Sequence, residues 1–158
     1  MPSDPEGNGR VRPRKSRQYG EFDLLSPYWR LGRIRYIGYS FLYSVSAALT
    51  LGILTLALSW LPPSLKDLAQ GFTFALVTGV WAYLTVVLTI KRCHDFDING
   101  WFSLLLLLPA GVFAFWLIPG TDGVNRYGRD LPPNTPIEKL LAIVAIACLT
   151  GGILFLLT

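Results

Sequence analysis

The stretch Tyr36–Leu65, with the sequence YIGYSFLYSVSAALTLGILTLALSWLPPSL, contains no charged side chain. A helix needs about 20 mostly apolar residues to cross the hydrocarbon core of a bilayer, and this stretch is long enough. Three more charge-free stretches follow it: Leu68–Ile90, Trp101–Thr121 and Leu140–Thr158. A protein of this length has too little interior to hide four such segments from water. The sequence therefore predicts a small all-α integral membrane protein.

The composition of the chain agrees with this prediction. Its 158 residues are 52% apolar and only 15% charged, whereas about 25% of the residues of a soluble domain are charged. This composition excludes a soluble enzyme, a disordered regulator and a secreted disulfide scaffold. Cys93 and Cys148 are too few for a disulfide framework, so we expect both to be free thiols.

The chain divides into three parts. Residues 1–20 are rich in Pro, Gly, Ser and Arg, which is typical of a disordered basic tail. Residues 21–35 mix apolar, aromatic and cationic side chains, and we expect them to lie flat at the membrane interface. Residues 36–158 form the transmembrane domain, a helical bundle. Its four expected transmembrane helices cover about 37–61, 69–90, 101–118 and 140–157.

The distribution of Lys and Arg predicts the orientation of the chain. Eight of the 14 basic residues precede Tyr36, so the positive-inside rule predicts a multi-pass protein with a cytoplasmic amino terminus. Four spans place ten basic residues inside and four outside. In an alternative topology, residues 101–118 enter the membrane and return, which makes the loop 119–139 cytoplasmic and changes the count to thirteen and one. We favour four spans, because a re-entrant backbone must be shielded by other protein.

The basic residues beside the first two spans are expected to contact anionic lipid headgroups, at about 1 kcal/mol for each residue. These expected headgroup contacts are Arg30, Arg33, Arg35, Lys91 and Arg92. A nucleic-acid partner is not expected, because the basic tail has one aromatic residue and no folded reader.

Small residues recur at four-residue spacing in two windows. They are Ser44, Ala48 and Gly52 in the first window and Gly71, Ala75 and Gly79 in the second. Such faces let two helices approach closely in lipid, so a second copy or another membrane protein is an expected partner. No Asp, Glu, Lys, Arg or His lies in the middle of a window, which argues against an ion pump or a coupled transporter.

The first polar loop motif, Lys91–Trp101, contains the only histidine of the chain, His94. His94 beside Asp95 is a candidate general base with its orienting carboxylate. The alternative, which we favour, is a hydrogen-bonded cap at the interface. Zinc sites usually have three or four strong ligands, so neither a metal nor another cofactor is expected here. We expect Arg33 and Arg92 to lie with this pair at the cytoplasmic boundary, one of them close to a carboxylate.

The second polar motif, residues 119–130, has three glycines, an asparagine and two aspartates. This composition is typical of a tightly turned loop with positive backbone dihedrals. Calcium loops place acidic ligands at alternate positions and end in Glu, which this loop does not. If residues 101–118 re-enter the membrane, the loop should join the first motif.

These motifs, in this order, resemble those of the domain-of-unknown-function 805 family of small bacterial inner-membrane proteins, over roughly residues 29–132. The matching residues are Arg30, Arg33 and Tyr36 before the first span, Arg92, His94, Asp95, Gly100 and Trp101 in the first loop, and Gly123, Asn125, Tyr127 and Gly128 in the second. The resemblance implies a location in the bacterial inner membrane. It singles out His94 and Asp95 but implies no chemical activity.

Three functions fit these observations. We expect a non-enzymatic membrane module of a structural, accessory or oligomerising kind, because the spans carry small-residue faces and no buried charge. A pore or transporter subunit for a small solute is the second hypothesis. The third and least supported is an enzyme that acts on lipid headgroups through His94 and Asp95, because the chain has no nucleophile elbow, phosphate loop or paired metal carboxylates.

Overall fold

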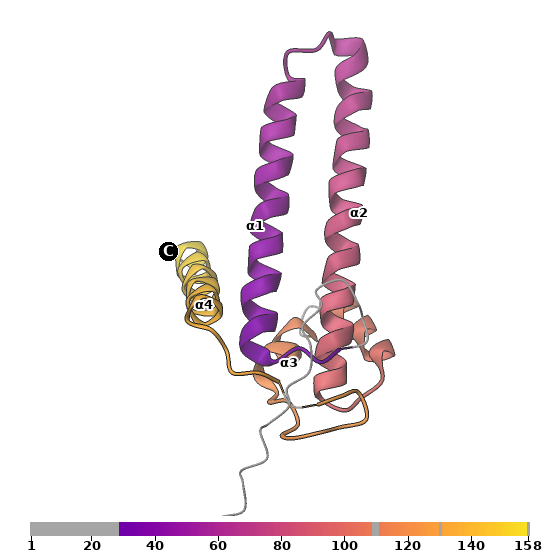
Figure 1. The fold of residues 1–158 in the computed structure, drawn as a ribbon. Helices are drawn as coiled ribbons and strands as arrows, with labels where there is room; N and C mark the ends of the chain where they lie inside the picture. The colour runs from indigo at the N-terminus through magenta and orange to yellow at the C-terminus, as the bar shows by residue number, and fades with distance from the viewer. Residues whose placement is uncertain (1–28, 109–110, 130, 158) are drawn as a thin grey trace, which may run out of the picture.

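The chain is all-helical in a computed structural model that describes residues 29–108, 111–129 and 131–157, and this part contains no strand (Figure 1). Three helices are long and apolar enough to cross a membrane: α1 (Arg33–Leu58), α2 (Pro63–Asp95) and α4 (Pro136–Leu157). Between α2 and α4 lie a 3₁₀ helix, η1 (Gly100–Leu107), and the short helix α3 (Gly111–Leu117). The all-α class is therefore confirmed, with three candidate membrane-spanning helices among the described residues. The expected tail 1–20 and residues 21–28 of the expected interfacial segment lie outside the described residues.

Helices α1 and α2 form a long antiparallel hairpin (Figure 1). Pro63 is the first residue of α2, a position where proline's missing N–H is not needed and its fixed φ suits the helix. The amides of Leu65 and Lys66 both donate to the carbonyl of Pro62 at 3.0 Å. Because only a few residues link α1 to α2, α2 runs back alongside α1.

The third expected span, 101–118, is not confirmed as a transmembrane helix. Its residues form η1 and α3, of eight and seven residues, both shorter than a span requires. The start of α3 lies close to the end of η1: the Gly111 amide donates to the Leu108 carbonyl at 2.8 Å. A Cβ on Gly111 would lie 1.8 Å from the Leu105 carbonyl oxygen, so only glycine permits this contact.

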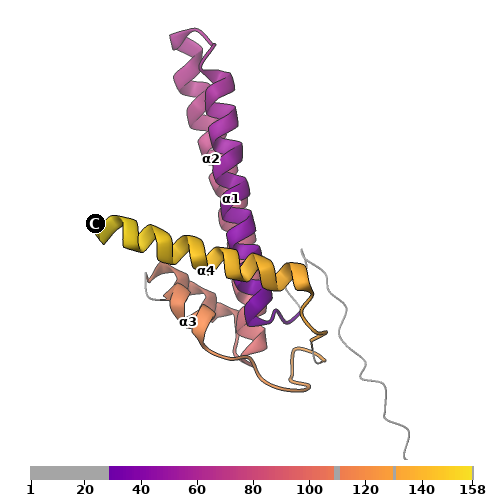
Figure 2. The same ribbon diagram turned by 90° about the vertical axis from the view of Figure 1, so that its left-hand side faces the viewer.

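Helix α4 begins with a reciprocal cap. The Thr135 amide donates to the Glu138 carboxylate at 2.7 Å, and the Glu138 amide donates to the Thr135 hydroxyl at 3.3 Å. This is the capping box that the Thr-x-x-Glu spacing encodes. Helix α4 then crosses α1 at a large angle (Figures 1 and 2). Gly38 makes this crossing close, because a Cβ there would lie 3.1 Å from the Leu141 Cβ.

Most of the buried core lies at one end of the hairpin, where α1 begins and α2 ends. We call this end the base; it comprises residues 29–39, 87–99 and 111–129. Its apolar core consists of Leu31, Tyr36, Leu88, Cys93 and Phe115. By contrast, no residue in the most apolar window of α1 is buried. In the corresponding windows of α2 and α4, only 17% and 11% of the residues are buried. The long helices therefore leave most of their apolar surface uncovered, as helices in lipid do.

Candidate functional site

Asp95, the last residue of α2, bridges two arginines inside the base. Its Oδ1 accepts from Arg30 Nη2 at 3.1 Å and from Arg30 Nε at 3.3 Å. Its Oδ2 accepts from Arg92 Nη1, one helical turn earlier on α2. Exposed fractions are 4% for Arg30, 0% for Arg92 and 3% for Asp95. These three residues form a buried charged cluster, and the expected ion pair of Arg92 with a carboxylate is present.

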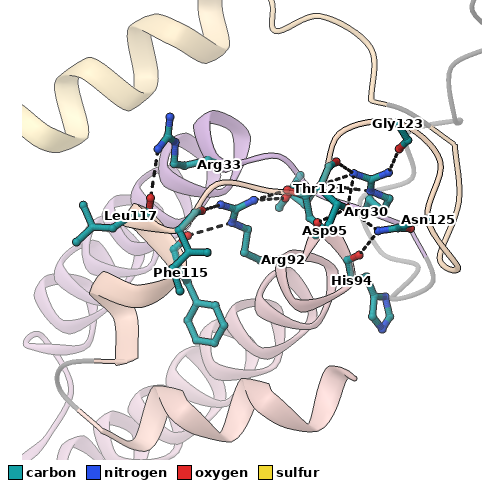
Figure 3. A network of polar contacts seen from close by, with 12 residues as sticks. Arg30, Arg33, Arg92, His94, Asp95, Phe115, Leu117, Thr121, Gly123 and Asn125 are labelled. Atoms are coloured by element: carbon teal, nitrogen blue, oxygen red, sulfur yellow. Dashed lines mark hydrogen bonds and ion pairs between the residues drawn. The ribbon is translucent and has the colours of Figure 1, made fainter. Parts of the chain in front are cut away.

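Arg92 uses its remaining donors to hold the returning chain. Its Nε donates to the Phe115 carbonyl at 3.0 Å, and its Nη2 donates to the Ile118 carbonyl (Figure 3). Its guanidinium carbon also lies 4.3 Å from the centre of the Phe96 ring, within the range of a cation–π contact. Because α3 ends on α2's last turns, the segment 100–117 starts and finishes at the base.

Arg30 and Asp95 hold the loop that follows α3. Arg30 donates to the carbonyls of Thr121 and Gly123. Thr121 in turn donates to the Asp95 carbonyl from its amide at 2.8 Å and from its hydroxyl at 2.9 Å. Gly120 passes directly over the carboxylate, since a Cβ there would lie 1.9 Å from Asp95 Oδ2. A larger residue would push the loop off the cluster.

The rest of the loop is shaped by Asn125. Its side-chain amide donates to the His94 carbonyl at 2.8 Å, and its Oδ1 accepts from the Tyr127 amide at 2.9 Å. Its backbone pairs with that of Gly128 through two bonds of 3.1 Å. Gly123 and Gly128 have φ values of 78° and 144°, which residues other than glycine rarely adopt. The second polar motif thus docks on the first, as the re-entrant alternative requires.

His94 lies at the edge of this arrangement. Its imidazole stacks on the Tyr127 ring, with centroids 3.9 Å apart and planes 9° from parallel. Figure 3 shows the imidazole pointing away from the Asp95 carboxylate, whose oxygens face Arg30 and Arg92 instead. The geometry therefore does not bring His94 and Asp95 together as a base and its orienting carboxylate.

The remaining residues of the first motif, Gly100 and Trp101, close the turn after α2. A Cβ on Gly100 would lie 2.9 Å from Ile90 Cγ2, so η1 starts tightly against α2. The Trp101 amide donates to Asn99 Oδ1 at 3.3 Å, while its side chain is 74% exposed. This places a large aromatic at the surface, which suits a membrane interface.

The basic residues expected at lipid headgroups differ in exposure. Arg30, Arg35, Lys91 and Arg92 are buried, with exposed fractions of 5% or less. Arg33 is exposed and donates from Nη1 to the Leu117 carbonyl at 3.3 Å. Among these five cations, Arg33 is therefore the one placed to reach a ligand outside the protein.

Glu138 is a buried acid that sequence reasoning missed. It accepts from Arg35 Nε at 2.8 Å and from the Tyr39 hydroxyl at 3.1 Å, and it is 9% exposed. This pair fastens the start of α4 to the start of α1. The Thr-x-x-Glu spacing could have revealed the helix cap, but nothing local indicates that Arg35 would face it. No group of three or more His, Cys, Asp or Glu side chains that could hold a metal occurs in the described ranges.

Comparison with known proteins places these motifs in a family. The chain matches the family described as "Protein of unknown function (DUF805)" over residues 24–129. It is similar to the Inner membrane protein YhaI of Escherichia coli strain K12 and of Escherichia coli O157:H7, with 40% identity over 52 residues in each case. The match covers 28% of this chain and 42% of the length of these relatives. No solved structure matches the chain.

Proposed function

Because the chain belongs to the DUF805 family of inner-membrane proteins of unknown function, we propose a role from its own geometry: it is a non-enzymatic accessory module that self-associates in the bacterial inner membrane. The saturation of the charged cluster carries the non-enzymatic part of this proposal, and the uncovered glycines of the long helices carry the self-association. Asp95 is bonded to two guanidinium groups, and both arginines are bonded to backbone carbonyls. These groups fasten the base and are not directed at a substrate.

The glycine positions of the long helices support self-association. A Cβ added at Gly52, Gly71 or Gly79 would meet no heavy atom within 4 Å. These glycines therefore do not serve the packing of α1 against α2. Small residues on an uncovered face let a second helix approach closely, which favours association in lipid.

The topology that we propose has the amino terminus in the cytoplasm, α1 and α2 crossing as a hairpin, and residues 100–117 re-entering from the cytoplasmic side. The contacts of Thr121 and Asn125 with α2's last turn support it, as does the basic-residue count of thirteen inside and one outside. Maleimide labelling of Val124→Cys and Ser64→Cys in sealed vesicles tests it. In a background without native thiols, the two sites should label from opposite sides.

Self-association is tested by counting subunits. Full-length protein with one fluorophore, in vesicles at a low protein-to-lipid ratio, should bleach in two or more steps. Gly79→Leu should shift the population towards single steps by blocking close approach, whereas the matched control Val80→Leu, on an exposed position, should not. Single-step bleaching of the unaltered protein contradicts the proposal.

Two measurements address the alternative functions. Solute leak from proteoliposomes above that of empty vesicles would support the pore or transporter hypothesis. A changed lipid profile in cells carrying His94→Ala would support the headgroup enzyme. The proposed module predicts neither change.

A further inference from the structure

A cavity of about 580 Å³ lies where all the helical elements meet. Its wall takes residues from α1, α2, η1, α3 and α4, among them Tyr36, Ala82, Leu106, Trp116 and Ala145. Pockets of about 300–1,000 Å³ are the usual size for small-molecule sites. This cavity is bounded by η1 and α3 on one side and by the hairpin on the other, in the half of the hairpin next to the base.

The chemistry of the wall suits a hydrocarbon chain. Most lining side chains are apolar, and the hydroxyl groups among them are already bonded within the protein. Ser40 and Ser44 donate to the carbonyls one turn earlier, Thr85 donates to the Trp81 carbonyl, and Tyr36 pairs with Thr89. A polar solute would lose its hydrogen bonds to water in the cavity and find few hydrogen-bond partners in exchange. The methylene groups of a hydrocarbon chain have no hydrogen bonds to lose.

A cationic group stands at the base end of the cavity. Arg33 is one helical turn before Tyr36 on α1 and is bonded to the carbonyl of Leu117, the residue after Trp116. Arg33 also lines a second, polar pocket of about 270 Å³, whose wall includes Arg30, Asp95, Asp122 and Asn134. Figure 3 shows Arg33 bonded to Leu117. The Asp95 carboxylate in this pocket is paired with Arg30 and Arg92 instead.

We propose that the cavity binds one acyl chain of an anionic phospholipid, whose phosphate is held by Arg33. Most of the wall lies on α1, α2 and α4, which are long and apolar enough to cross a membrane, so membrane lipid is the hydrocarbon expected around it. Guanidinium groups bind phosphate through paired, charge-assisted hydrogen bonds, and Arg33 is the exposed arginine next to the cavity. This inference goes beyond the proposed function, because it concerns a site within a single chain and does not require self-association.

Photolabelling tests the site directly. Full-length protein is placed in phosphatidylcholine vesicles that contain a small fraction of phosphatidylglycerol with a diazirine in its acyl chain. After irradiation, peptide mapping should find labels on Ser40 and Trp116, which line the cavity and are half-buried. The same probe on phosphatidylcholine should label these two residues severalfold less.

Four variants identify what binds. Ala82→Phe fills the cavity and should abolish labelling of Ser40 and Trp116, whereas Ala57→Phe, the same change at the far end of α1, should not. Arg33→Gln should reduce the preference for phosphatidylglycerol, whereas Arg129→Gln, at an exposed arginine that lines neither pocket, should preserve it.

Each contrary result overturns the inference in a distinct way. Equal labelling by both lipids removes the role of Arg33. Labelling unaffected by Ala82→Phe places the lipid outside the cavity. Crosslinks from Ser40 to a second copy of the chain would show that protein fills the space. A protein that bleaches in single steps but shows the expected labelling would contradict the proposed self-association and leave this inference intact.

Discussion

Replacing Asp95 with asparagine should open the base of the molecule. The substitution keeps the size of the side chain and removes the negative charge that Arg30 and Arg92 share. Both guanidinium groups are almost completely buried, so neither can recover its lost partner from water. Breaking a buried ion pair by removing one partner costs about 3–5 kcal/mol. Since every 1.4 kcal/mol is tenfold, the population of the opened base should rise by about two to three and a half orders of magnitude.

Cys93 provides a native reporter of this opening. Its thiol is 0% exposed and belongs to the core of the base. In a Cys148→Ser background, alkylation of Cys93 requires local opening, and its rate follows the opened population when reclosing is fast. The rate in the Asp95→Asn variant should therefore exceed that of the parent by at least one hundredfold, by the same conversion.

The matched control is Asp97→Asn, two residues further along the chain. Asp97 also pairs with an arginine, Arg126, but the two side chains are 42% and 62% exposed. Exposed pairs contribute about 1 kcal/mol or less, so this variant should change the rate by about fivefold at most. Equal alkylation rates in the Asp95 and Asp97 variants would refute the view that the charged cluster holds the base closed.

Two further predictions concern close contacts elsewhere. Gly120→Ala places a Cβ 1.9 Å from the carboxylate of the charged cluster and should cost about 1–3 kcal/mol; it should speed Cys93 alkylation, whereas Gly71→Ala, with open space around it, should not. Glu138→Gln removes the carboxylate that pairs with buried Arg35 and should lower the thermal unfolding midpoint in detergent, and the exposed neighbouring change Lys139→Gln should leave the midpoint unaltered.

The expectations that rest on local properties of the sequence agree with the structure, whereas the one that depends on a specific tertiary contact does not. The windows 37–61, 69–90 and 140–157 became helices α1, α2 and α4 because hydropathy and length are local properties of the sequence. The window 101–118 is likewise free of charged side chains, yet it forms two short helices. Its course depends on a contact between Gly111 and the backbone of Leu105, and composition averaged over a window does not register such a contact.

The sequence by itself determined that this protein is a helical membrane protein and that its charged residues lie outside the apolar helices. It also singled out Arg92, Asp95 and Asn125 through their motifs. Only the tertiary structure decided what these residues touch, because Arg30 and Asp95 are 65 residues apart in the chain. A cation beside a membrane binds lipid or a carboxylate according to which lies within reach, and that depends on how the segments fold together. For this reason the cluster holds Arg30 and Arg92 inside the protein and leaves Arg33 outside.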